Sequence, residues 1–593
     1  MADIRVRVSN QMQITPIAEV LATEGLAAPV INALVPDGVN YKVALMQPCG
    51  QIKASSIGVQ NRDRDLARKQ FGKFLAGTQA AGADLVVTPE YSMPWETLVV
   101  AIKENRVPAA GKLWVLGCES IKYSELQALK EELAPTAVVL FEELQPDEQR
   151  FTDPLVYVFN AVPINEGGAS KTIVLVQFKT HPMGDNNHFE VNGMQRGTRI
   201  YQFGGGGQGL KLVSLICSDV FAFQDADALA IYDRAVVIHI QLNRKPRQNQ
   251  FRQYRDRLLQ YKGDETEVLC LNWASDVREW SGEQPTLWNN IAGSAWYLRP
   301  KDFDERDATL NANHRRGLYY TWLETSQAHA LFFNYNPATY LLVATKVAHI
   351  GVTASVSRRR GPQLLQTRVW NDAGEDWVEQ LEADDGFSGV VGEAGHAKDQ
   401  IQNLRDANPM DAERVLALCA GKIRHDGGWH SVRRLDSCVI DGSEVIRRMT
   451  FCQDTDPEAT EFRVRRLKRC GRLWDILNTH KYLPPALADF KDGFRLEWSS
   501  NSPHQNAISE KGKRATVVYM GEEASAARIE EIAKTLAEFL HRGFSDPGAS
   551  HSARQRLAVW FRKNEEIVQL DPGRYIKFDR PGDASEFDIG RET

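Results

Sequence analysis

Short apolar runs recur through roughly the first 350 residues, and most of them are apolar at consecutive positions. Runs of this kind, bounded by polar segments, predict strands that are buried on both faces. The spacing of apolar residues over 63–81 predicts an amphipathic helix that ends at Gly82. Many short strands separated by helices and turns indicate two sheets covered by helices. The predicted strands are 41–47, 83–88, 113–118, 137–141, 155–159, 173–178, 210–217, 235–240, 267–272 and 330–333.

The pattern changes beyond about residue 350, where a polar stretch rich in Asp and Gly runs over 371–397. Regular patterning then returns. A strand is predicted over 515–520, and an amphipathic helix over 525–542 with Ser525 as its N-cap. We therefore expect a second folded domain, of the α/β or α+β class. The predicted organisation is an N-terminal extension over 1–40, a first domain over 41–354, and a second domain over 355–593 that contains the polar linker 371–397.

The composition narrows the choice of protein class. A chain of 593 residues with 43% hydrophobic and 25% charged residues is ordinary for a globular protein of more than one domain. The formal net charge of -6 is small for this length, so charge alone indicates neither a nucleic-acid nor a membrane partner. The eight cysteines are scattered without a Cys-x-x-Cys pair, which argues against a zinc site and a disulfide framework. We expect a cytoplasmic protein with no membrane span.

Four side chains in the first domain carry candidate chemistry. Glu90, Lys179 and Cys217 each stand at or just past the end of an apolar run, and Glu190 follows Phe189. Each residue alone has an ordinary interpretation: a loop carboxylate, a solvated lysine, or a cysteine buried in the core. Together, a thiol, an amine and two carboxylates are what covalent hydrolysis of a carbon–nitrogen bond requires.

The segments around these residues resemble motifs of the nitrilase superfamily of carbon–nitrogen hydrolases. The resemblance covers about residues 40–350 and is carried by the sequences at 82–90, 179–182, 189–190 and 215–219. It implies an α-β-β-α sandwich and a homo-oligomer. Sequence departures such as the basic stretch 242–257 leave the substrate open.

The resemblance also implies roles for individual residues. Cys217 is the expected nucleophile, and Glu90 the expected general base. Lys179 is expected to stabilise the oxyanion and to favour the thiolate, and Glu190 to orient Lys179. Ser218, through its backbone N–H, and His181 are expected to contact the substrate. The implied activity is hydrolysis of a small amide-type substrate through a Cys thioester, with neither a metal nor an organic cofactor. Nitrile hydrolysis and amide transfer stay open.

Two alternatives concern partners. The basic stretches at 244–257 and 463–472 could contact nucleic acid, but interspersed acids such as Asp256 and Glu461 favour solvated or salt-bridged faces without excluding it. The rival function is a nitrilase-like sensor, effector or scaffold module gated by the C-terminal domain, for example in a bacterial defence system. That domain could then bind a protein partner.

Overall fold

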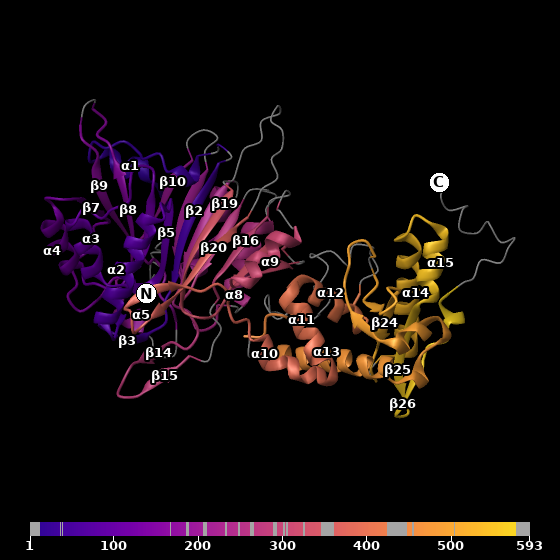
Figure 1. Cartoon of the computed structure of the whole chain (residues 1–593). Coiled ribbons are helices and arrows are strands. Elements are labelled where there is room, and N and C mark those ends of the chain that lie inside the picture. Colours follow the sequence, from indigo (N-terminus) through magenta and orange to yellow (C-terminus); the bar gives the residue numbers. More distant parts are fainter. Residues whose placement is uncertain are drawn as a thin grey trace, which may run out of the picture. The chain divides into compact units, whose positions relative to one another are not determined.

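The chain forms two compact units in the computed structural model, residues 1–384 and 385–593 (Figure 1). In the part of the chain that the structure describes, no helix is both long and apolar enough to cross a membrane. The described residues are 12–35, 37, 39–165, 168–184, 189–205, 210–231, 234–246, 249–260, 266–288, 293–299, 303, 306–323, 326–345, 361–423, 448–453, 456–502, 504–522 and 524–576.

Two large sheets form the core of the first unit. One has the strand order β21-β20-β19-β2-β5-β6-β8-β9-β7, and the other β1-β10-β11-β12-β13-β16-β18-β17. The strands of the nine-stranded sheet are β2 (Asn40–Gln47), β5 (Leu85–Met93), β6 (Leu113–Cys118), β7 (Val138–Phe141), β8 (Pro154–Ala161), β9 (Lys171–Phe178), β19 (Ala338–Thr345), β20 (Gln363–Asn371) and β21 (Asp376–Glu379). Those of the eight-stranded sheet are β1 (Gln13–Pro16), β10 (Arg199–Gly204), β11 (Lys211–Ile216), β12 (Ala235–Ile240), β13 (Glu267–Leu271), β16 (Ala295–Leu298), β17 (Leu318–Leu323) and β18 (Ala328–Phe333).

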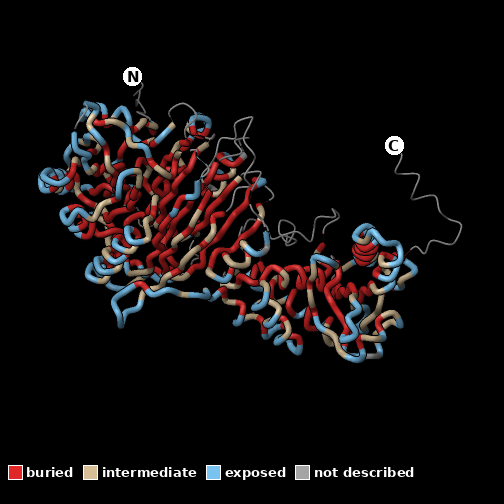
Figure 2. Tube along the Cα trace, turned by 45° about the horizontal axis from the view of Figure 1, so that its top comes forward, coloured by how far each residue is buried: buried red, intermediate tan, exposed pale blue. Residues whose placement is uncertain are grey.

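The two sheets pack face to face through aromatic side chains. The rings of Tyr157 in β8 and Phe203 in β10 lie 4.9 Å apart, and Gln177 Nε2 donates a hydrogen bond of 3.0 Å to the Ser214 carbonyl across the same interface. Strands such as β5 and β12 are therefore buried on both faces, as their continuous apolar sequences predict. Figure 2 shows that the strands inside this unit are largely buried.

Helices cover the outer faces of both sheets. The helices α2 (Arg64–Ala80), α3 (Trp95–Lys103) and α4 (Tyr123–Leu133) pack their apolar sides on the nine-stranded sheet (Figure 1). On the eight-stranded sheet, α8 (Asn249–Gln260) packs its Tyr254 ring 5.0 Å from that of His239 in β12. The predicted α-β-β-α sandwich is confirmed.

A smaller sheet of four strands, β15-β14-β3-β4, lies at one end of this unit (Figure 1). It consists of β3 (Gln51–Ser55), β4 (Gly58–Asn61), β14 (Arg278–Trp280) and β15 (Pro285–Leu287). Its apolar side chains share one buried cluster with Tyr91 of β5 and with Trp273, which follows β13.

The predicted ends of the first domain are wrong at both sides. At the N-terminal side, β1 and α1 (Ile17–Ala22) belong to the unit rather than to an extension, because β1 pairs in parallel with β10. At the other side, β20 pairs with β19 and β21 pairs with β20, so the division falls after Asp384 and not at 354. The sequence analysis missed these elements because they lack the continuous apolar runs that identified the other strands. Strand β1 has only four residues, and β20 of the β20–β21 hairpin is only partly buried.

The second unit has the predicted mixed class. Its five-stranded sheet, β22-β23-β24-β25-β26, joins antiparallel neighbours to one parallel pair, β24 and β25. Its strands are β22 (Phe494–Leu496), β23 (Ala507–Ser509), β24 (Arg514–Tyr519), β25 (Leu557–Lys563) and β26 (Glu566–Gln569); its main helices are α11 (Lys398–Ala407), α12 (Pro409–Cys419), α13 (Pro457–Asn478), α14 (Ala526–Arg542) and α15 (Pro547–Gln555).

The stretch 371–397 is not a linker. Strand β21 lies inside it, and Phe387, Val391 and Ala394 are buried in the hydrophobic core of the second unit. The apolar residues are widely spaced among Asp and Gly, so the composition concealed them.

The hairpin gives a test of the boundary. A chain ending at 384 should be soluble and should unfold cooperatively, whereas a chain ending at 354 should aggregate. The shorter chain lacks Leu364 and Trp377, which are 0% and 8% exposed, and leaves the edge of β19 unpaired. Size-exclusion chromatography of the two chains measures the difference. Equal solubility and equal melting temperatures would show that the sheet does not need the hairpin.

Candidate active site

The structure brings all four predicted catalytic side chains together in the first unit. Glu90 lies in β5, Lys179 directly follows β9, Cys217 directly follows β11, and Glu190 lies in the short helix α5 (Phe189–Gly193). The Lys179 Nζ is 2.7 Å from Glu90 Oε1 and 2.7 Å from Glu190 Oε1. The ammonium therefore joins the two carboxylates, and its charge lowers the pKa of the Cys217 thiol.

A fifth residue, Asp153, belongs to the cluster and was missed by the sequence analysis. Its Oδ2 lies 3.4 Å from Lys179 Nζ, and both side chains are fully buried. Asp153 precedes β8, which runs antiparallel to β9 with Pro154 opposite Phe178. The start of β8 therefore meets the end of β9 at one sheet edge. The only available signal was a carboxylate directly before an apolar run.

Neighbouring donors fix both glutamate side chains. Glu90 Oε2 accepts from the Leu242 N–H at 2.5 Å. Glu190 accepts from the Tyr91 hydroxyl at 3.0 Å and from the Met183 N–H at 2.6 Å. Burial raises the pKa of Glu90 above its ordinary value, and the positive charge of Lys179 opposes that rise. A carboxylate with a raised pKa accepts a proton more readily, as a general base must.

The amine of Lys179 keeps its charge. Burial lowers the pKa of this ammonium, but the negative charges of Glu190, Glu90 and Asp153 raise it, and the net pKa lies well above the ordinary range. A permanent positive charge in a dry site is what stabilisation of a developing oxyanion requires.

A strained turn presents Cys217. Its φ is 39°, in the left-handed region, where a residue other than glycine is strained. The Cys217 N–H donates to the Ile240 carbonyl at 2.8 Å, and its carbonyl lies 2.9 Å from His239 Nε2. Burial lowers the pKa of His239 to about 3, so the ring is neutral, and Nε2 can donate to this carbonyl.

The thiol itself is protonated in this state. Burial raises the pKa of Cys217 well above its ordinary value, the charge of Glu90 raises it further, and Lys179 only partly opposes the rise. The charge of Lys179 acts in the expected direction, toward the thiolate, but burial and the carboxylates outweigh it in the resting site. The proton has to move to a base as the thiol attacks.

The predicted substrate contacts, Ser218 and His181, bond to each other. The Ser218 hydroxyl donates to the His181 carbonyl at 2.6 Å, so the side chain is engaged within the protein. Asp219 accepts from the N–H groups of Ile216, Thr180 and His181 at 2.7–3.0 Å. Contact of the Ser218 N–H and of the half-buried His181 with a substrate stays a prediction.

The acidic side chains of the cluster also have the residue types of a cation site. Oxygens of Glu90, Asp153 and Glu190 lie within 4.8 Å of one another. The Lys179 ammonium contacts all three, at 2.7, 3.4 and 2.7 Å. A metal ion bound there would face the positive charge of Lys179 at close range, so this donor set does not fit a metal.

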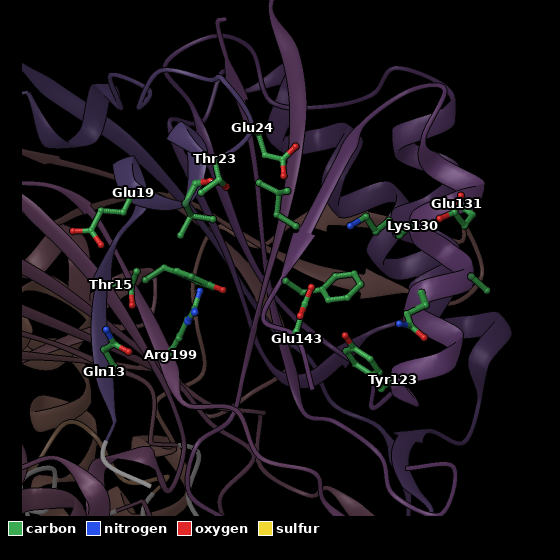
Figure 3. A pocket seen from close by; sticks show the side chains of 16 residues that line it. Gln13, Thr15, Glu19, Thr23, Glu24, Tyr123, Lys130, Glu131, Glu143 and Arg199 are labelled. Atoms are coloured by element: carbon green, nitrogen blue, oxygen red, sulfur yellow. The ribbon is translucent and has the colours of Figure 1, made fainter. Parts of the chain in front are cut away.

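A cavity of about 730 Å³ lies apart from these residues (Figure 3). It is lined by parts of β1, α1, α4 and β10, and its walls carry charges of both signs, including Glu19, Glu24, Lys130 and Arg199. None of the cluster residues lines it. The cavity is therefore separate from the candidate active site.

No family model matches the chain, and no curated protein matches it. Solved structures that match include a glutamine-dependent NAD+ synthetase from Acinetobacter baumannii, with 12% identity, a TM-score of 0.29, and coverage of 64% of this chain and 56% of that chain. An amidase from Nesterenkonia sp. matches with 11% identity, a TM-score of 0.29, and coverage of 53% of this chain and 93% of the amidase. Nit3 from Saccharomyces cerevisiae, a member of branch 10 of the nitrilase superfamily, matches with 12% identity and a TM-score of 0.26. The match covers 45% of this chain and 83% of Nit3. The chain thus spans just over half the length of the synthetase. The nitrilase superfamily, which the motifs indicated, is the family named for Nit3.

Removing the ammonium should destabilise the first unit in a pH-dependent way. In Lys179→Met, three buried carboxyl groups lose the ammonium that they share, which should cost about 3–5 kcal/mol at pH 8. The loss should shrink toward pH 5, because carboxyl groups with raised pKa values then bind protons in the folded state. Urea unfolding at both pH values measures it. Lys69→Met, which removes an exposed partner of Glu375, is the control and should have little effect. Equal losses in the two variants would contradict the description of the cluster.

Proposed function

We propose that the first unit hydrolyses a non-peptide, amide-type C–N bond through a thioester on Cys217. The observation that carries the proposal is the buried triangle in which Lys179 Nζ holds Glu90 and Glu190 at 2.7 Å each, within electrostatic range of the Cys217 thiol. In this proposal Glu90 is the general base, Lys179 the oxyanion stabiliser and Cys217 the nucleophile.

The first half-reaction consumes the amide. The Cys217 sulfur bonds to the carbonyl carbon as its proton passes to the Glu90 carboxylate, and the carbonyl oxygen becomes an oxyanion facing Lys179. The C–N bond then breaks, and the proton on Glu90 passes to the leaving nitrogen. Ammonia or an amine departs, and the acyl group stays on sulfur.

The second half-reaction restores the thiol. Glu90 takes a proton from water as the water oxygen attacks the thioester carbon. The C–S bond breaks, the proton returns from Glu90 to sulfur, and a carboxylic acid leaves. Glu190 and Tyr91 hold Lys179 in place throughout, since their hydrogen bonds involve neither the nucleophile nor the base.

The surroundings of the cluster support a small, uncharged substrate. Trp273 donates to the Glu90 carbonyl at 2.8 Å and belongs to an apolar cluster with Tyr91, against which Phe189 and Leu242 pack. These side chains offer apolar surface beside the reactive groups, so we favour a simple amide over a charged substrate.

The basic stretches have partners inside the protein. Arg244 pairs with Glu279 and lies 4.9 Å from the centre of the Trp288 ring. Arg255 is buried, with its guanidinium 4.7 Å from the Tyr297 ring.

In the other stretch, Arg463 and Arg466 are buried, whereas Arg465 pairs with Glu461 at 2.6 Å. Partners of this kind support the salt-bridged interpretation over nucleic-acid binding in both stretches. A homo-oligomer and a cytoplasmic location remain predictions.

One observation favours a second function, a switched module. Glu90, Lys179 and Cys217 are each no more than 1% exposed, so a substrate reaches them only if neighbouring segments move. A regulated enzyme, opened by a partner or by the second unit, would have such a resting state.

Replacing the nucleophile tests the first function. Cys217→Ala should abolish ammonia release from a panel of acetamide, propionamide and L-glutamine, because no thioester can form. Cys118→Ala removes an equally buried thiol in β6 and should retain turnover. Loss of activity in both variants, with circular dichroism unchanged, would contradict the assignment.

Thiol labelling tests the closed state. At pH 7 iodoacetamide should modify Cys217 more slowly than the half-buried Cys49, and the rate should rise with pH because burial raises the pKa of the Cys217 thiol. Peptide mass spectrometry at several times gives both rates in one sample. Fastest labelling of Cys217 at pH 7 would indicate an open site with a resting thiolate.

A further inference from the structure

The buried cluster contains more acidic groups than Lys179 can neutralise. Three carboxyl groups, those of Glu90, Glu190 and Asp153, surround one ammonium, and the cluster residues are at most 9% exposed. If all three were ionised, the cluster would carry an excess of two negative charges away from water. Such an arrangement is unfavourable unless other groups donate to the charged oxygens.

The glutamates have such donors, whereas Asp153 does not. All the glutamate oxygens accept hydrogen bonds, from Lys179, Leu242, Tyr91 and Met183. Among the described residues, neither side-chain oxygen of Asp153 has a hydrogen-bond partner. Its closest ion-pair distance, 3.4 Å to Lys179 Nζ, is longer than the two of 2.7 Å.

The backbone prevents Asp153 from leaving this position. The Lys179 N–H donates to the Asp153 carbonyl at 2.9 Å, and Pro154 begins the pairing of β8 with β9. The side chain is thus fixed at the sheet edge, with an oxygen within 4.8 Å of Glu90 and Glu190 oxygens. A buried carboxyl group that lacks the short hydrogen bonds of the two glutamates is better accommodated with a proton of its own.

We propose that Asp153 is a neutral carboxylic acid that donates its proton in a hydrogen bond to the Glu90 carboxylate, and that it positions this base; the proposal extends the hydrolase function given above. A protonated carboxyl group is both a donor and an acceptor, so it can stand beside Glu90 where a second anion could not. The two side chains then share one proton, as paired carboxylates do when they lie too close to ionise together.

The effects of the charged and titratable neighbours on the pKa of Asp153 are consistent with a neutral carboxyl group. Burial raises the pKa of Asp153 well above its ordinary range, the charges of Glu90 and Glu190 raise it further, and Lys179 opposes the rise. Tyr91 and Cys217 also lie within electrostatic range and are neutral, since burial raises the pKa of each. In the reaction, the proton on Asp153 stays in place while Glu90 carries a second proton between sulfur, nitrogen and water.

Infrared spectroscopy tests the proton directly, independently of activity. In the wild-type protein at pH 7, labelling aspartate with ¹³C at the side-chain carboxyl should shift a C=O stretching band of a protonated carboxyl group. Asp153→Asn should remove that band. Retention of every aspartic-acid band in Asp153→Asn, or the absence of such a band from the labelled wild-type protein, would overturn the proposal.

Kinetics and stability test the positioning role. Asp153→Ala should lower kcat on the amide panel at least tenfold, and Asp153→Asn, whose amide can still donate to Glu90, should restore most of it. Relative to wild type, Asp153→Asn should also gain stability from pH 5 to pH 8, because only the wild type holds a proton that unfolding releases in this range.

Opposite results identify the alternatives. A kcat for Asp153→Asn as low as that of Asp153→Ala, with a stability difference from wild type that does not change between pH 5 and pH 8, would mean that Asp153 is an ionised partner of Lys179. If Cys217→Ala keeps full activity, the hydrolase function fails, while the infrared result still decides the state of Asp153.

Discussion

The arrangement of the candidate site depends on the buried ion pairs that the Lys179 ammonium makes with Glu90 and Glu190. Its two hydrogen bonds of 2.7 Å join a residue of β5 to one of α5, and its own position is set by the end of β9. A charge that is fully buried is tolerated only with partners in good geometry. The strand ends that carry those partners must therefore meet at one edge of the sandwich, and the sheet order satisfies this requirement.

The same charge distribution keeps the thiol of Cys217, the proposed nucleophile, protonated. Carboxylates around Lys179 stabilise the ammonium, but they oppose the formation of a thiolate at Cys217. The proposed reaction therefore depends on a base that accepts the proton during attack rather than on a thiol that is already ionised. In that reaction, attack is favourable only when a bound carbonyl group can take the negative charge next to Lys179.

The sequence indicated the candidate catalytic residues that end or follow apolar runs, together with the layered fold those runs build. Asp153 was missed because it precedes an apolar run instead of following one. It lies near Lys179 because β8 runs antiparallel to β9, and no local sequence pattern encodes that direction. Strand β20 was missed because its residues neither alternate between buried and exposed nor are all buried. Strand β1 was missed because it is only four residues long. Whether such segments form strands depends on pairing with strands that are distant in the sequence, and not on local propensity.

One side chain links the segments that carry Lys179 and Cys217. Lys179 follows a strand of one large sheet and Cys217 a strand of the other, yet Asp219 accepts from N–H groups on both sides, those of Thr180 and Ile216. Because this carboxylate spans the two sheets locally, we expect the separation of Lys179 and Cys217 to change less than the sheet-to-sheet distance does. Thermal expansion or compression of the aromatic layer between the sheets should then have little effect on the geometry of the site at its edge.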